Sequence, residues 1–258
     1  MTTAGVQTPP FGALMRQWRE RRRLSQLDVA IEAAVSPRHV SFLETGRSTP
    51  SRAMVLRLAD VLDVPLRERN QLLLAAGLAP AYGERSLDDP DMAAVRAGVE
   101  RVLGAYNPFP CIAVDRNWHI MRANEGAGVL LDGVAPALLE RPNALRIALH
   151  PDGLAPRIRN LAQWRHHLLD RLRREVAVSG SIELSALLAE IASYAGGSDA
   201  TGDLGRIAVP LELYRPDGRL LTFLSTVTTF GTALDLTAAE LSIEAFLPAD
   251  EDTAAALR

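Results

Sequence analysis

The chain has 258 residues, of which 48% are hydrophobic and 23% charged, and its formal net charge is −3. This composition is typical of a soluble protein with a sizeable core, and the length exceeds one average domain. No run of eighteen uncharged apolar residues occurs, so we expect no membrane span, and the N-terminus lacks the build of a secretory signal. A single cysteine, Cys111, excludes an internal disulfide and a thiolate zinc site, which fits a cytoplasmic protein.

Five helices are expected in the first 77 residues, beginning near Phe11, Ser25, Ser36, Ser51 and Leu66. Ser25 followed by Asp28 predicts a capping box at the second helix. Ser36 followed by Pro37 predicts the third helix, because proline fits the first helical position. Gly46 is suited to end that helix.

The second and third helices meet the demands of a helix-turn-helix. Ala30 is small enough to let one helix pack across the other. The inner faces bury four apolar side chains: Val29, Val35, Val40 and Leu43. The outer face of the third helix is short and polar, with Ser36, Arg38, His39 and Ser41. Its N-terminus presents free N–H groups and a partial positive charge, which suit phosphates.

These residues resemble a known family over positions 11–77. Gln26, Ala30, Val35, Val40 and Leu43 match Cro- and lambda-repressor-like helix-turn-helix domains, the xenobiotic-response-element family. The SFLETGRSTPS segment is also similar. The chain departs from the family at Ala34, where glycine is frequent. Alanine at that position costs about 1 kcal/mol if the backbone needs a positive φ.

The resemblance implies a set of DNA contacts. Gln26 and Arg47 would hold phosphates, and the positions facing the major groove are Ser36, Pro37, Arg38, Ser41 and Phe42. Arg38 would contact a guanine, since its forked donors match O6 and N7, and His39 would touch a base or the backbone. As alternatives, Gln26 could complete a cap and Phe42 could belong to the core. The first helix also carries arginines that either are solvated or attract phosphates: Arg19, Arg21, Arg22 and Arg23.

Charge and composition divide the chain into domains. Residues 1–77 carry a net charge of +4 and residues 78–258 a net charge of −7, so the N-terminal domain is the part expected to meet a polyanion, unless the asymmetry is chance. The segment 78–91, rich in Gly, Pro and Asp, predicts a linker. A second domain is expected over 92–250, with 251–258 as a tail.

The second domain alternates between strand and helix patterns. In chain order we expect a helix over 92–105, a hairpin in FPCIAVDRNWHIMRAN, helices near 125–131, 135–149, 157–177 and 183–194, a flexible loop over 196–205, a hairpin turning at 215–218, and a strand over 241–248. About five strands, with the helices gathered between the second and third, predict an α+β fold: an antiparallel sheet covered by helices.

No catalytic pattern occurs in this domain. The five histidines of the whole chain lack HExxH or metal-ligand spacing, and no phosphate loop or GxSxG is present. The adjacent carboxylates Asp88 and Asp89 lie in the expected linker, so we interpret them as solvated side chains. We therefore expect no enzyme, metal or cofactor, although haem at His119 or His150 is a rival interpretation that lacks an attachment motif.

Several segments of the second domain resemble the MmyB-like ligand-binding domain. They are PFPCIAVDRNWHIMRAN, ALHPDGL, WRHHLLDRLRRE and LSTVTTFGTALDLTAAELSIEAFLPAD. That family joins a Cro-like helix-turn-helix to a PAS-like sheet domain. The resemblance implies a one-component transcription regulator with a fatty-acid-like ligand.

An apolar ligand would lie in a cavity between the sheet and the helices. Candidates for the lining are Tyr106, Phe109, Cys111, Ile112, Val114, Trp118, Trp164, Leu168, Phe223 and Phe230. Candidates for holding a carboxylate head group are Asn124, His167, Arg171 and Thr228. The alternatives are plain core packing for the first group and a structural or solvated role for the second.

Together these features predict a DNA-binding transcription regulator whose second domain senses a small apolar ligand, a fatty acid or acyl compound, and tunes operator binding. One recognition helix reads few base pairs, so we expect a homodimer on two half-sites of double-stranded DNA. Two other classes remain as alternatives: an antitoxin-like module that binds a protein partner, and a lipid carrier or enzyme without sequence-specific DNA binding.

Overall fold

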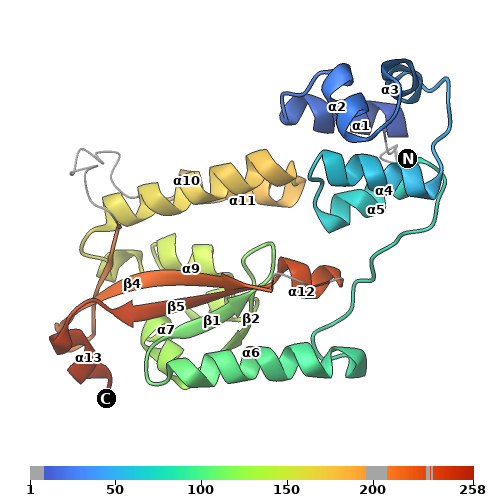
Figure 1. Ribbon diagram of the computed structural model, residues 1–258. Helices are drawn as coiled ribbons and strands as arrows, with labels where there is room; N and C mark the ends of the chain where they lie inside the picture. Colours follow the sequence, from blue (N-terminus) through green and yellow to red (C-terminus); the bar gives the residue numbers. More distant parts are fainter. Residues whose placement is uncertain (1–8, 196–207, 231–232, 234) are drawn as a thin grey trace, which may run out of the picture. The chain divides into compact units, whose positions relative to one another are not determined.

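The computed structural model describes residues 9–195, 208–230, 233 and 235–258. The chain divides into two compact units, with the division between Glu84 and Arg85, inside the segment expected to be a linker. The first unit also takes in a short stretch around Leu236. The loop expected over 196–205 lies outside the described residues. Figure 1 shows the elements of both units.

The first unit is helical, and its helices are α1 (Phe11–Arg21), α2 (Gln26–Glu32), α3 (Pro37–Glu44), α4 (Arg52–Val61) and α5 (Leu66–Ala75). The capping box at α2 is confirmed: the Ser25 hydroxyl accepts the Asp28 N–H, and the Asp28 carboxylate accepts the Ser25 N–H. The Ser36 hydroxyl caps α3 by accepting the His39 N–H, with Pro37 in the first helical position. The local sequence therefore specifies where both helices of the pair begin.

One apolar cluster holds the five helices together. Its large members include Phe11, Met15, Trp18, Val40, Leu43, Val55, Leu58, Leu62, Leu72 and Leu73. Val29 and Ala30 are fully buried as expected, whereas Val35 is half-buried. Gly12 permits a close approach of α1 to α3, because a Cβ there would lie 2.4 Å from the carbonyl oxygen of Glu44.

The second unit contains a five-stranded antiparallel sheet in the order β2-β1-β5-β4-β3. Its strands are β1 (Cys111–Val114), β2 (Ile120–Ala123), β3 (Leu211–Tyr214), β4 (Leu220–Thr229) and β5 (Ser242–Pro248). The predicted α+β fold is confirmed, including both hairpins. In the second hairpin, Gly218 has a φ of +83°, which the turn requires of its last residue.

Helices cover both faces of this sheet. The α-helices are α6 (Ala93–Tyr106), α7 (Gly128–Leu131), α8 (Pro136–Leu139), α9 (Ala144–Leu149), α10 (Leu161–Ser179), α11 (Ile182–Ser193), α12 (Leu236–Glu240) and α13 (Glu251–Leu257). Three short 3₁₀ helices complete the unit: η1 (Pro90–Met92), η2 (Glu125–Ala127) and η3 (Ala155–Arg157). Helix α6 lies along one face, and α9, α10 and α11 lie on the other (Figure 1).

Two expectations about these helices were wrong. The single helix expected over 135–149 is divided into α8 and α9, because the Asn143 side chain accepts the N–H groups of Leu145 and Arg146 and so starts a new helix. The expected tail over 251–258 is the helix α13. Its Thr253 hydroxyl accepts the N–H of Thr222 at 3.0 Å, which joins this helix to the start of β4.

Side chains alternate across the sheet and divide the core into two layers. Ile112 of β1 pairs with Glu244 of β5, so both face α9 and α10. Cys111 pairs with Ala245, and both face α6 in a separate apolar cluster. This alternation decides which residues can meet a ligand on each side.

Candidate nucleic-acid interface and apolar cavity

Helix α3 has a polar outer face and an inner face that is packed in the core. Val40 and Leu43 are completely buried, whereas Ser36, Pro37 and Arg38 are exposed. His39 and Ser41 are half-buried. The residues expected to face a DNA groove therefore lie together on one surface of α3.

Phe42 lies on this surface rather than in the core. Its ring is half-buried and is not part of the apolar cluster of the unit. The guanidinium of Arg38 lies over the ring at 5.1 Å from its centroid, and that of Arg47 lies at 5.8 Å. Cation–π contacts of this kind orient the two cations relative to α3.

Glu44, at the end of α3, is held by hydrogen bonds from two other helices. Arg19 donates from Nε to Oε1 at 2.6 Å and from Nη2 to Oε2 at 3.0 Å, and Gln26 donates from Nε2 to Oε2 at 2.8 Å. The Glu44 side chain is only 4% exposed. The hydrogen bond to Glu44 raises the pKa of Arg19.

This cluster assigns roles that the sequence left open. Arg19 is neither solvated nor available to phosphate, because its Nε and Nη2 bind Glu44 and its Nη1 donates to the carbonyl oxygen of Leu24 at 3.0 Å. Gln26 bonds to Glu44 instead of completing a cap; its amide has a second N–H and an oxygen. Arg22 donates to the carbonyl oxygen of Leu62 at 2.8 Å, and Arg21 lies over the Trp18 ring at 4.9 Å.

The turn between α2 and α3 has the strained conformation that was considered for Ala34. Its φ is +53°, in the left-handed region that favours glycine. The departure from the family pattern therefore falls on a position where a glycine would be less strained.

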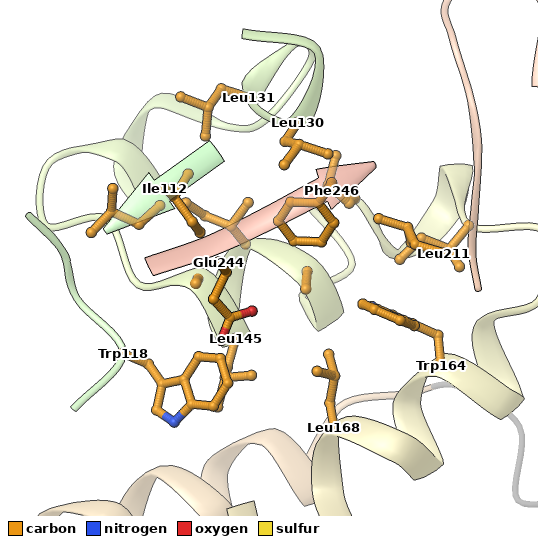
Figure 2. Close-up of a pocket in the computed structure, with 16 residues that line it drawn as sticks. Ile112, Trp118, Leu130, Leu131, Leu145, Trp164, Leu168, Leu211, Glu244 and Phe246 are labelled. Carbon is orange, nitrogen blue, oxygen red and sulfur yellow. The ribbon is translucent and has the colours of Figure 1, made fainter. Parts of the chain in front are cut away.

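An apolar cavity of about 50 Å³ lies in the second unit, between the sheet and helices α9 and α10 (Figure 2). Its walls are Ile112, Trp118, Ile120, Leu130, Leu131, Ala144, Leu145, Ile147, Ala148, Leu154, Ile158, Trp164, Leu168, Leu211, Glu244 and Phe246. Among these described residues, Glu244 is the one with a charge. In Figure 2 its carboxylate points away from β5, toward Trp118, Leu145 and Leu168.

The carboxylate of Glu244 has one cationic neighbour. Nη1 of Arg171 lies 2.7 Å from its Oε1, an ion pair that is close but not aligned as a hydrogen bond. Glu244 is 5% exposed, and burial raises its pKa, although the charge of Arg171 opposes that rise. A carboxylate that is buried beside one guanidinium, without an aligned hydrogen bond, is uncommon and needs a reason.

A polar ring joins this pair to the surface. Arg171 lies 4.3 Å over the ring of Trp118, the Trp118 indole donates to Glu175 at 2.8 Å, and Arg171 donates to Glu175 at 3.1 Å. Trp118 has a φ of +68°, a strained backbone for a bulky residue. It lines both the cavity and an adjoining open groove of about 610 Å³.

The structure brings some of the expected ligand residues to the cavity. Trp164 and Leu168 line it, as do Ile112 and Trp118. Arg171 reaches Glu244 from the groove side.

Other expected residues lie elsewhere. Cys111 is on the α6 face of the sheet, because strand alternation turns it away from the cavity, and Tyr106, at the end of α6, and Phe230, just after β4, pack in the same cluster. Phe223 packs edge to face on Phe246, with ring centroids 6.4 Å apart, and so lies behind the wall. Thr228 is exposed on β4.

The remaining polar candidates have structural contacts. Asn124 binds the backbone of Leu103, Cys111 and Ala127, and also the carbonyl oxygen of Phe109 at 2.8 Å. His167 packs on Trp164 at 5.5 Å, and burial lowers its pKa, which favours the neutral ring.

Two known domain families match this arrangement. Residues 95–258 match the MmyB-like transcription regulator ligand binding domain, and residues 10–72 match a helix-turn-helix domain. The chain belongs to the MmyB-like transcription regulator family. Both resemblances predicted from the sequence are thereby confirmed.

The chain is also similar to individual proteins. An uncharacterized HTH-type transcriptional regulator of Bacillus subtilis (strain 168), RghRB, is 37% identical over 76 residues, which are 29% of this chain and 52% of that protein. The chain thus matches about half the length of this relative. Among solved structures, the restriction-modification controller protein C.AhdI from Aeromonas hydrophila is 32% identical, with 23% of this chain and 89% of that one covered and a TM-score of 0.22. An RNA-binding light-oxygen-voltage receptor is 14% identical, with 99% and 65% covered and a TM-score of 0.28.

The chain therefore combines a helix-turn-helix domain with the ligand-binding domain of MmyB-like transcription regulators. Within the described ranges, no helix is long and apolar enough to cross a bilayer. Nor do the described residues bring three or more His, Cys, Asp or Glu side chains together as a metal site.

Glu244 was missed in the sequence. The signal is a lone acid inside the apolar strand SIEAFLP, where it shares the alternation of Ser242 and Phe246. Such a residue points into the domain if the strand is covered on both faces, and this one is.

Proposed function

We propose that this protein is a one-component regulator that binds operator DNA as a homodimer and changes its affinity when a small apolar ligand enters the second unit. The outer face of α3 supports the DNA-binding part of the proposal, and the apolar cavity supports the ligand part. A regulator of this kind works in the cytoplasm, where the operator is.

The proposed DNA contacts come from one continuous surface. Arg38 reads a guanine, and Phe42 keeps Arg38 and Arg47 near α3. Gln26 is fixed by Glu44 through one N–H, which leaves the other to meet a phosphate. Ser36, Pro37, His39 and Ser41 complete the surface toward base edges and backbone.

The proposed ligand is a fatty acid or acyl compound that lies against Trp164 and Leu168. The cavity of about 50 Å³ has room for one or two water molecules, so an aliphatic chain must widen it. Trp118 is placed to move, since it separates the cavity from the groove of about 610 Å³. A ligand can alter operator affinity only if it binds the two states of the protein unequally.

Fluorescence anisotropy with an operator fragment tests the DNA-binding part. Arg38→Ala should weaken binding and reduce the preference for the correct base by about 1–3 kcal/mol. The matched control is Arg101→Ala, which removes an exposed arginine of α6 and should leave affinity unchanged. Equal affinity and selectivity for wild type and Arg38→Ala would remove the groove assignment.

Native mass spectrometry of the purified protein tests the ligand part. We expect either a co-purified lipid or a rise in melting temperature with a panel of acyl compounds. An empty protein that no acyl compound stabilises would contradict this part and leave the DNA-binding part standing.

A further inference from the structure

The cavity is almost entirely apolar, but one carboxylate, that of Glu244, lines it. Glu244 projects from the middle of β5 with Oε1 fully buried, and among the described residues its partner is Arg171, whose ion pair at 2.7 Å is not aligned as a hydrogen bond. Burying a carboxylate in this way costs free energy unless a hydrogen-bond donor or a cation replaces the lost water. The free direction of Glu244 is the cavity itself (Figure 2).

The charges around Glu244 favour a donor over an anion. The charged groups that face it are Arg171 and Glu175, both from α10, and the cavity-facing residues of β1, β2, β3, α7 and α9 are uncharged. Arg171 is already shared between the two carboxylates. A further anionic head group would place three negative charges around one guanidinium.

We propose that Glu244 receives the head group of the ligand, and that this ligand is an aliphatic chain whose head donates a hydrogen bond. An alcohol meets this requirement directly, and a fatty acid meets it when the complex holds one proton between the two carboxyl groups. The inference rests on the proposed ligand-sensing function and specifies the chemistry that its site selects.

The proton balance follows from this arrangement. An alcohol O–H donates to the Glu244 carboxylate, and no proton is taken up. A fatty acid carboxylate binds with uptake of one proton from solution, which bridges the two carboxyl groups. Acid binding should therefore strengthen as the pH falls, whereas alcohol binding should depend little on pH. The raised pKa of Glu244 favours that uptake.

The test is a fluorescence titration of the full-length protein with 1-decanol and with decanoate at pH 8 and pH 6. Two of the three tryptophans, Trp118 and Trp164, line the cavity and report occupancy. Wild type should bind decanol about tenfold or more tightly than decanoate at pH 8. The difference in affinity between decanol and decanoate should be smaller at pH 6.

Glu244→Gln converts the acceptor into a group that also donates. Its amide N–H can bond to a carboxylate, so decanoate should gain about tenfold at pH 8 and lose its pH dependence. The control is Glu212→Gln, which changes a half-buried strand carboxylate that does not line the cavity and should leave the preference intact.

Three results would overturn the inference. Equal or tighter binding of decanoate by wild type at pH 8, or an unchanged preference in folded Glu244→Gln, refutes the role of Glu244 while ligand sensing stands. Binding of neither compound refutes the inference and the proposed ligand together. If Glu244→Gln does not fold, the pH dependence of the wild-type titrations decides alone.

Discussion

The two units each bury a glutamate beside an arginine, and the two pairs are built differently. In the first unit, both oxygens of Glu44 accept hydrogen bonds, from Arg19 and Gln26, and the pair ties three helices together. In the second unit, Oε1 of Glu244 has Arg171 nearby but accepts no hydrogen bond from the described residues, and its carboxylate lines a cavity.

This difference shows how a buried carboxylate that stabilises the fold can be distinguished from one that lines a binding site. A buried carboxylate with all its acceptor positions used stabilises the arrangement that it sits in. A buried carboxylate with an unused acceptor beside empty space destabilises the empty protein and gains a partner when a ligand binds. Burial alone would have classed Glu44 and Glu244 together.

The largest expected effect is on the first pair. Glu44→Ala leaves the Arg19 guanidinium buried without an anion, so thermal or urea unfolding should show a loss of about 3 kcal/mol in the stability of the first unit. The control, Arg16→Ala, breaks the exposed pair with Glu20 and should change stability by less than about 1 kcal/mol. Similar losses in the two variants would contradict a structural role for Glu44.

A smaller loss is expected for Arg171→Met, which keeps an apolar stem on Trp118 but removes the cation beside Glu244. We expect the free energy of unfolding to fall by about 2 kcal/mol at pH 8. The loss should shrink as the pH falls, because the neutral acid no longer needs the cation. The comparison is Arg173→Met, an exposed pair on the same helix with Asp170, and urea unfolding at both pH values measures each variant. A loss that does not vary with pH would argue against a desolvated Glu244.

Glu244→Gln should have the opposite sign. The folded protein raises the pKa of Glu244, so this carboxyl contributes stability below the pKa of the unfolded chain, about 4.3, and loses it as the pH rises through the folded value. The amide avoids that loss. The variant should therefore melt a few degrees higher at pH 8, equivalent to about 1 kcal/mol, and match wild type near pH 4. A lower melting temperature at pH 8 would show that Arg171 outweighs the desolvation of Glu244.

The smallest expected effect comes from backbone strain at Ala34. Ala34→Gly relieves a positive φ, and the first unit should gain about 0.5–1 kcal/mol. Ala13→Gly, at a helical position of α1, should lose a similar amount. Calorimetry that finds the same sign for both changes would show that the turn does not prefer glycine.

Local patterns predicted most of the fold. The Ser25–Asp28 box and the Ser36–Pro37 start depend on residues next to one another, so they could be read before any tertiary structure was known. The division between α8 and α9 also has a local signal that the prediction overlooked, because Pro142 cannot continue a helix and Asn143 caps the next one. The contact from the Asn143 amide to the backbone of Asn117 is the part that depends on tertiary structure.

The candidate sites were predicted unequally for the same reason. The outer face of α3 follows from one helix and its periodicity. The cavity depends on which face of the sheet each strand residue occupies, so Cys111 and Ile112, adjacent in sequence, fall on opposite sides. Glu244 acquires its meaning from Arg171 and the empty space beside it, and both come from long-range packing.

Cys111 has a practical consequence. Its thiol is completely buried on the α6 face, and burial raises its pKa to about 11, so it stays protonated and shielded at neutral pH. Because the chain has no other cysteine, one engineered on an exposed helix position would be the sole reactive thiol. Spin labels or fluorophores can thus be attached to an otherwise native protein, and distances between labels can test the proposed homodimer and its response to operator and ligand.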